Sequence, residues 1–200
     1  MSHYVKFTYA RTRAEIPAFD ELVGLNACRR RLRALRVIGV DSNGIGFGNL
    51  SVRDGETNNF YITGSATGGL PELTAADCVR VVAYDFASNW LRYEGAAIPS
   101  SESLTHAAIY ESDPSTSAVI HCHESVLWGT LLDRVPTTSK SVAYGTPEMA
   151  YEIMRLFKAN DVRSMKILVM AGHKGGIVSF GKNLEEAFGV FMRERRASSP

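Results

Sequence analysis

The sequence has few of the residues that mark specialised classes of protein. Its three cysteines, Cys28, Cys78 and Cys122, are odd in number and have no Cys-x-x-Cys spacing, which argues against a disulfide scaffold and favours reduced thiols. No apolar run is long enough for a membrane span, and residues 1–6 lack the apolar stretch of a signal peptide. These absences predict a cytoplasmic protein without a membrane partner.

The chain also has almost no net charge. Its 22 Lys and Arg residues nearly balance its 21 Asp and Glu residues, so the overall field attracts neither nucleic acid nor an anionic surface. The one basic cluster covers residues 29–36, and Leu22, Val23, Leu32 and Leu35 supply an apolar face around it. This pattern predicts the solvated side of an amphipathic helix, not a nucleic-acid interface.

Length and periodicity indicate the class of fold. Two hundred residues with 45% hydrophobic content can form one ordinary domain with a sizeable core, in which residues 1–15 would be an N-terminal arm. Apolar periodicity and turn residues predict helices at residues 16–40, 101–112, 124–132, 147–159 and 184–196, and strands at 46–52, 60–63, 78–84, 90–93, 118–123, 167–170 and 176–180. We therefore expect a single α/β domain with three layers, α/β/α, and a mixed central sheet.

Two of the five histidines occupy one tripeptide, His121-Cys122-His123, at the end of the apolar run that starts at Ala118. Because side chains alternate along a strand, His121 and His123 should share one face and Cys122 the other. Such a pair alone is more often structural than metal-binding. However, His173 follows another apolar run inside a glycine-rich turn, and Glu102 begins a helical segment. Three imidazoles and a carboxylate suit an open, catalytic divalent-metal site.

The sequence allows more than one role for His106. It lies four residues after Glu102, so the two side chains share a helix face. It could be a fourth ligand, a partner of a ligand or a core histidine. The apolar neighbours Leu104, Ala107 and Ala108 favour one of the last two roles.

Three turns have the composition of anion sites. Residues 44–51 combine several glycines with Asn49, residues 63–69 combine glycines with hydroxyl groups, and Ser100-Ser101 precedes the helix of Glu102. Each turn alone is a weak signal, because Gly and Ser mark turns and helix caps more often than phosphate sites. Their occurrence beside a candidate metal cluster makes a phosphate pocket a competitive hypothesis.

The order of these motifs resembles the class II aldolase/adducin family. The similarity extends from about residue 26 to residue 191 and rests on five short segments: Gly48–Arg53, Ile62–Gly64 with Thr67-Gly68, Pro99–Glu102, His121–His123 and Gly172-His173. By this resemblance, His121, His123 and His173 are ligands of a divalent metal, with Zn²⁺ ahead of Mn²⁺, Co²⁺, Ni²⁺ and Fe²⁺. Glu102 corresponds to the catalytic carboxylate.

The resemblance also implies a substrate and an assembly. The positions that hold a substrate phosphate correspond to Asn49, Thr67, Gly68, Ser100 and Ser101, with Thr63-Gly64 as an alternative to Thr67-Gly68. The implied function is that of a metal-dependent aldolase or related lyase, epimerase or dehydratase. It would act on a small, phosphorylated keto-sugar or sugar acid through a metal-stabilised enediolate, as a homo-oligomer, most simply a tetramer. The alternative is a non-catalytic, adducin-like assembly domain, but adducin-type domains lack a complete ligand set.

Two departures from the family pattern stand out. Residues 124–146 form a shorter segment than in the aldolases, and the part that carries a catalytic tyrosine from a neighbouring subunit is missing, so Tyr144 is not assigned that role. A lysine, Lys174, follows His173 where the family usually has glycine. The lysine could bind an anion or simply be solvated.

Overall fold

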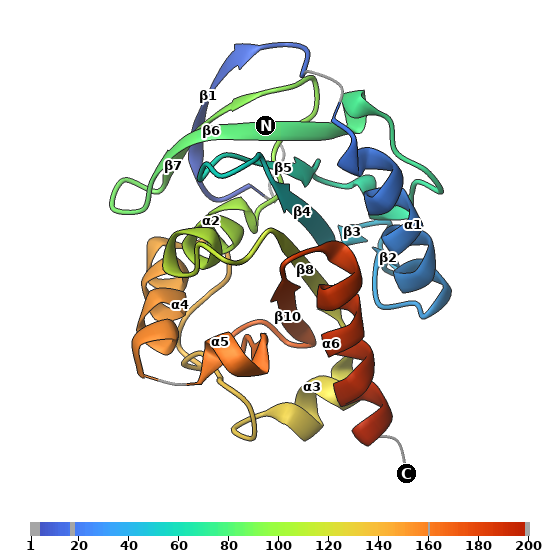
Figure 1. The fold of residues 1–200 in the computed structure, drawn as a ribbon, viewed down its shortest axis with the longest axis vertical. Helices are drawn as coiled ribbons and strands as arrows, with labels where there is room; N and C mark the ends of the chain where they lie inside the picture. Colours follow the sequence, from blue (N-terminus) through green and yellow to red (C-terminus); the bar gives the residue numbers. More distant parts are fainter. Residues whose placement is uncertain (1–4, 17–18, 160, 199–200) are drawn as a thin grey trace.

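The computed structural model describes residues 5–16, 19–159 and 161–198, which are arranged around an eight-stranded sheet (Figure 1). The strand order is β1-β7-β6-β5-β4-β8-β10-β9. Strand β1 pairs parallel with β7, and all other neighbours are antiparallel, so the sheet is mixed. The strands are β1 (Thr8–Arg13), β4 (Asn49–Arg53), β5 (Phe60–Thr63), β6 (Cys78–Asp85), β7 (Trp90–Glu94), β8 (Ala118–His123), β9 (Ile167–Val169) and β10 (Gly176–Gly181).

Helices cover both faces of this sheet. They are α1 (Glu21–Ala34), α2 (Ser103–Ser112), α3 (Ser125–Leu131), α4 (Pro147–Ala159), α5 (Val162–Met165) and α6 (Leu184–Ala197). A short ribbon of β2 (Gly39–Val40) and β3 (Gly46–Phe47) and two 3₁₀ turns, η1 (Thr67–Gly69) and η2 (Ala75–Asp77), complete the described elements. None of the described helices is long and apolar enough to cross a bilayer.

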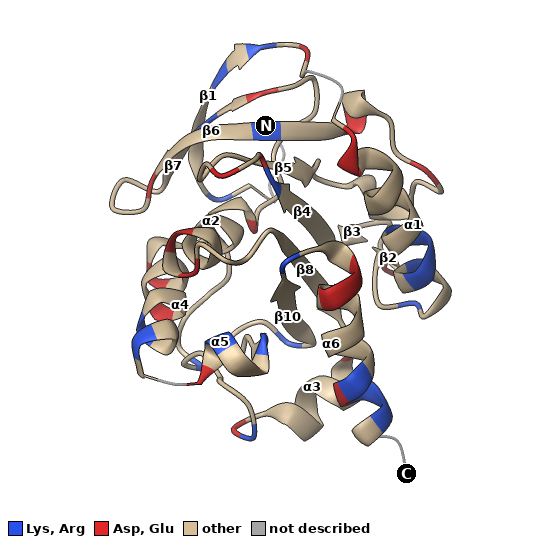
Figure 2. Cartoon of the chain, viewed as in Figure 1, with Lys and Arg blue, Asp and Glu red and all other residues tan. Residues whose placement is uncertain are grey.

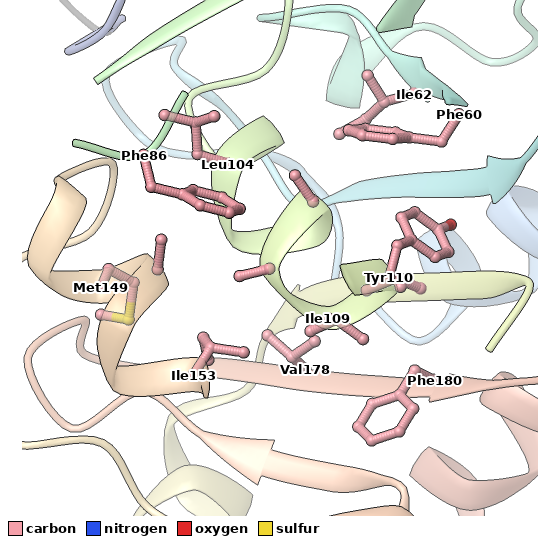
Figure 3. Packing of buried hydrophobic residues seen from close by; sticks show 14 of the residues in the cluster. Phe60, Ile62, Phe86, Leu104, Ile109, Tyr110, Met149, Ile153, Val178 and Phe180 are labelled. Atoms are coloured by element: carbon pink, nitrogen blue, oxygen red, sulfur yellow. The ribbon is translucent and has the colours of Figure 1, made fainter. Parts of the chain in front are cut away.

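Two hydrophobic cores, one on each face, hold the layers together. On one face, α2 and α4 pack on the sheet through residues such as Ile109, Ile153 and Phe180 (Figure 3). On the other face, α1 and α6 contribute Leu25 and Phe191 to the second core. Each central strand supplies both cores by alternation, as burial on both faces requires. The predicted three-layer α/β/α fold with a mixed sheet is thus confirmed.

Most predicted elements occur close to their expected limits, and β5 and α4 match them residue for residue. Helix α6 has Glu185 and Glu186 in its first turn and Arg195 and Arg196 in its last (Figure 2). This arrangement suits the helix dipole. The sequence did not predict β1, which lies within the expected N-terminal arm, nor α5 and the two 3₁₀ turns.

The predicted helix over residues 16–40 is wrong at both ends. Helix α1 starts at Glu21 and ends at Ala34, while residues 17 and 18 lie outside the described residues. Arg36 then takes a positive φ of 59°, which turns the chain towards β2. The predicted strand over residues 46–52 divides at Gly48, whose φ is 78° and where a β-carbon would lie 2.3 Å from Ile38 Cγ2. Only glycine fits this close turn.

The basic cluster on α1 is not wholly solvated. Leu25, Cys28, Arg29 and Leu32 form its buried stripe, spaced as one helix face, whereas Val23 is 78% exposed. Arg29 donates hydrogen bonds from Nη2 to the carbonyls of Thr67 (2.9 Å) and Leu70 (3.1 Å). The predictions that Arg29 is exposed and that Val23 is buried are therefore wrong. Arg29 instead ties the η1 turn to α1.

Candidate metal centre and its cleft

Strand β8 places the two histidines of the tripeptide on one face, as predicted. Cys122 is buried in the core beneath α1 and α6, on the opposite side. His121 is paired with Asn49 of β4 on one side of the strand and with Val178 of β10 on the other. The site is therefore built on the centre of the sheet, where backbone positions are fixed by neighbours on both sides.

His173 reaches the same point from the turn between β9 and β10. Its N–H donates to the Met170 carbonyl (3.0 Å), and its carbonyl accepts from the Gly176 N–H (2.8 Å), so the turn is closed around it. A β-carbon at Gly176 would lie 2.7 Å from His173 Cδ2 and 3.3 Å from His121 Cε1. The absence of a side chain at Gly176 is what lets the two rings approach.

The three imidazoles converge through their Nε2 atoms. His123 Nε2 lies 3.0 Å from His121 Nε2 and 3.0 Å from His173 Nε2, and one nitrogen from each ring falls within 4.8 Å of the others. Two nitrogens bound to one tetrahedral Zn²⁺ at 2.0–2.1 Å would be about 3.3 Å apart. The spacing of these donors thus fits a single divalent ion.

The protonation state suits metal binding as well. Burial lowers the pKa of His123 to about 4. Burial, together with the neighbouring His123 and the charge of Lys6, lowers the pKa of His173 to about 3. The pKa of His121 is held well below its usual value by burial and by the adjacent imidazoles. All three rings are therefore neutral at neutral pH, which is the form that ligates a metal.

Glu102 lies in the same cleft, at the N-cap of α2, and only 3% of its surface is exposed. Its Oε2 accepts a hydrogen bond from Thr105 Oγ1 (2.7 Å), but its buried Oε1 has no partner among the described residues. Burial raises the pKa of Glu102 to about 7, against the opposing effects of Thr105 and Lys6. A position at the start of a helix would lower the pKa of a carboxyl group, so desolvation outweighs the helix effect at Glu102.

His106 is a core histidine. Its Nδ1 lies 2.7 Å from Ser51 Oγ, which lies 2.7 Å from the Tyr110 hydroxyl, and all three residues are buried. It is not part of the group of converging donors found among the described residues. The alternative of a fourth ligand is therefore not supported by the geometry.

The cleft around these side chains has a volume of about 680 Å³, within the range of small-molecule sites. The predicted anion-binding residues Asn49, Gly68, Ser100 and Ser101 line it, and Asn49 Oδ1 is buried without a partner in the described part of the chain. Thr67 does not line it, because its hydroxyl donates to the Gly64 carbonyl (2.8 Å). This bond closes the turn from Gly64 to Gly68.

Both ends of that turn contribute to the cleft. Gly64 and Gly68 line it, together with the intervening Ser65 and Ala66, so neither Thr-Gly pair alone forms this wall. The turn is packed tightly on the β2–β3 ribbon: a β-carbon at Gly68 would lie 2.3 Å from the Gly39 carbonyl oxygen. The Thr63 hydroxyl is turned away and accepts from the Leu50 N–H (3.3 Å).

Tyr144 is a cleft residue that the sequence did not identify. Tyr144 lies in the loop before α4, and its ring centroid is 4.4 Å from that of His173. A lone tyrosine in a loop has no periodicity or spacing that would place it here. Lys174, by contrast, is exposed and is not among the residues that line the cleft.

Comparison with known proteins gives a consistent assignment of the fold. One similar solved structure is an L-fuculose 1-phosphate aldolase, with 24% identity, a TM-score of 0.68, and coverage of 92% of this chain and 84% of that one. A sugar-phosphate aldolase from Thermotoga maritima has 16% identity, a TM-score of 0.66, and coverage of 90% and 92%. L-fuculose-1-phosphate aldolase from Thermus thermophilus has 19% identity, a TM-score of 0.63, and coverage of 88% and 90%.

A family model assigns the sequence directly. The model of the class II aldolase and adducin N-terminal domain matches residues 40–197, which include every predicted metal-binding and catalytic residue. The match covers well over half of the sequence and extends through β4, β8 and the turn of His173. The chain therefore belongs to the class II aldolase/adducin family.

Proposed function

We propose that this protein is a divalent-metal-dependent lyase of the aldolase type, acting on a small, phosphorylated keto-sugar or sugar acid. The observation that carries the proposal is the convergence of three imidazole nitrogens beside the unpartnered Oε1 of Glu102, in one cleft. A complete donor set of this kind favours an enzyme over an adducin-like assembly domain. Epimerase and dehydratase reactions need the same donor set and remain within the proposal.

His121, His123 and His173 would hold the metal through Nε2. Zn²⁺ is the first choice, and Mn²⁺, Co²⁺, Ni²⁺ or Fe²⁺ are alternatives because imidazole suits several first-row ions. When bound, the ion would supply a Lewis acid for the carbonyl oxygen of the substrate. Three protein ligands leave coordination positions open for that oxygen and for an adjacent hydroxyl.

Glu102 would move the proton. A carboxyl group with a pKa of about 7 is present in both protonation states at neutral pH, which is the condition for efficient general acid–base catalysis. Thr105 fixes Oε2, so Oε1 is the oxygen free to exchange a proton with the substrate. The same burial that raises the pKa also keeps competing water away from the carboxyl group.

The phosphate of the substrate would bind at the part of the cleft lined by Asn49, Gly68, Ser100 and Ser101. The side-chain amide, the hydroxyls and the backbone N–H groups of glycine-rich turns are suitable partners for an anion. Thr67 would act by keeping the turn closed through its bond to Gly64. No lysine or arginine is among the described residues that line the cleft.

The proposal extends to assembly and substrate range. We expect a homotetramer with sites near the subunit boundaries. Because residues 124–146 form a shortened segment, we expect poor turnover of L-fuculose-1-phosphate itself and better turnover of another short, metal-chelating sugar phosphate.

Three measurements test the proposal. Elemental analysis of the purified protein should find about one divalent ion per chain, and a screen of keto-sugars should show cleavage or isomerisation of phosphorylated compounds in preference to unphosphorylated ones. Light scattering should give the mass of a tetramer. A protein that contains no metal and takes up none at micromolar concentration would refute the enzyme and favour the assembly domain.

A further inference from the structure

The cleft lacks a cation for its proposed anionic substrate, but the N-terminal arm brings one to its edge. Lys6 lies just before β1, and its Nζ donates to the Tyr144 carbonyl (3.0 Å) and lies 3.6 Å from the centre of the Tyr144 ring. Tyr144 lines the cleft and contacts the ring of His173. The side chain of Lys6 therefore packs on a residue of the cleft wall.

Ser101, a second residue that lines the cleft, borders the same place. A β-carbon at Gly145 would lie 3.3 Å from the Ser101 carbonyl oxygen and 3.4 Å from Lys6 Cδ. The lysine stem and the start of the α2 segment thus pack on the two sides of one glycine. This places the stem of Lys6 near the end of the cleft where Ser100-Ser101 is proposed to bind an anion.

The arm is fixed in this position by Asn89. The Asn89 side-chain amide donates to the carbonyls of Lys6 (2.9 Å) and Gly145 (3.4 Å), while the backbone carbonyl of Asn89 accepts from the Thr8 N–H (2.9 Å). One residue of the β6–β7 turn therefore connects the arm to the loop of Tyr144. The lysine is held at the cleft by a specific set of bonds and not by a chance contact.

The charge of Lys6 is available to a ligand. Among the described residues, no carboxylate forms an ion pair with it, and an ammonium group has three N–H donors, of which the Tyr144 carbonyl takes one. Burial dominates the pKa values of Glu102 and His173, but the field of Lys6 lowers both. Its charge thus acts across the site even before a substrate is bound.

We propose that Lys6 is a specificity-determining residue, which binds the phosphate or carboxylate group of the substrate at the Ser101 end of the cleft. This inference rests on the proposed function, since it assumes an anionic substrate. It assigns the N-terminal arm a direct role in substrate selection: compounds with an anionic group at that end are favoured over neutral ones of the same shape. The interaction adds to the uncharged donors of Asn49 and Ser100.

The test uses a matched pair of probes, dihydroxyacetone phosphate and dihydroxyacetone, which differ only in the phosphate. Their binding to the metal-loaded protein is measured by calorimetry and by NMR line broadening. We expect Lys6→Gln to weaken binding of the phosphate by about 3- to 10-fold, the range for a partly exposed charge pair, and to leave binding of dihydroxyacetone unchanged. Lys6→Arg should restore binding, and 0.5 M salt should reduce the difference, because salt screens exposed charges.

The control is Lys158→Gln, which removes an exposed charge from the last turn of α4 and should have no effect on either probe. Equal loss of both probes in Lys6→Gln would show that Lys6 only fastens the arm, and unchanged phosphate binding would overturn the inference directly. If the wild-type protein binds both probes equally, the proposed phosphate site itself fails, and the inference fails with it.

Discussion

Two sets of histidines, His106 alone and the trio His121, His123 and His173, lie on the α2 side of the central sheet and have different environments. His106 Nδ1 is hydrogen-bonded to Ser51 Oγ at 2.7 Å, which is in turn bonded to Tyr110, while the buried Nε2 has no partner among the described residues. The rings of His121, His123 and His173 face one another instead, with nitrogens at 3.0 Å and no carboxylate or carbonyl between them. Burial keeps both groups neutral, lowering the pKa of His106 to about 3 and that of His123 to about 4. What separates the core histidine from the three candidate ligands is therefore the hydrogen-bonding partner and not the protonation state.

The largest expected effect comes from breaking the converging group. We expect His121→Ala to abolish binding of the divalent ion, because the two remaining imidazoles are an incomplete donor set. Elemental analysis and calorimetric titration with Zn²⁺ measure the loss. His106→Gln is the matched control and should retain about one ion per chain. Loss of the metal in both variants would mean that the comparison between the two groups is false.

The second effect concerns Glu102 and should separate chemistry from metal binding. Glu102→Gln should keep the fold and most of the metal but lower kcat by about 10²- to 10⁴-fold, the range for loss of a general acid or base. Steady-state kinetics on a substrate identified by the screen would measure it, alongside metal content. Full activity would place the proton-transfer group elsewhere. Loss of the metal would make Glu102 chiefly a ligand.

The third effect concerns His106, the histidine that is hydrogen-bonded in the core. His106→Ala should lower the free energy of unfolding by about 2–4 kcal/mol, since it removes a fully buried ring and a hydrogen bond and leaves a cavity. Chemical denaturation of the metal-free protein would measure this. His123→Ala should cost clearly less in the same assay, because the ring has no hydrogen-bonding partner other than its fellow imidazoles. A larger cost for His123→Ala would reverse the comparison.

The smallest effect is a pH dependence of the metal-free protein. Because the folded pKa of Glu102 is about 7 and its usual value is 4.5, the folded state holds a proton that the unfolded state releases between these values. The contribution of this group to stability therefore falls as pH rises from about 4.5 to 7 and is constant above. Glu102→Gln removes this loss of stability, because glutamine has no carboxyl group to ionise.

Denaturation of wild type and Glu102→Gln at pH 5 and pH 8 isolates the contribution of Glu102 to the free energy of unfolding, since the histidines are present in both proteins. The variant should gain about 2–3 kcal/mol relative to wild type between the two pH values. A difference that does not change with pH would show that the carboxyl group is not desolvated in solution.

Local patterns were sufficient to predict much of the framework and to single out the three histidines whose side chains converge. The alternation in residues 118–123 specified which side chains share a face, and strand β8 follows it, because a period of two leaves no other arrangement for a buried strand. The limits of β5 and α4 followed from turn residues and apolar spacing. The end of α1 and the division of the strand at Gly48 did not, because Arg36 takes a positive φ and Gly48 turns closely against Ile38, and neither feature has a local sequence signal.

The sequence by itself identified His121, His123, His173 and Glu102 as candidate site residues, because residue type and strand or helix period are local properties. Only the tertiary structure decided that the three nitrogens meet, that Gly176 leaves room for them, and that burial raises the pKa of Glu102 to about 7. It also brought Lys6 and Tyr144 to the cleft from segments 138 residues apart in the chain. Distances across such separations and the loss of solvent depend on packing of the whole chain, and no local pattern encodes them.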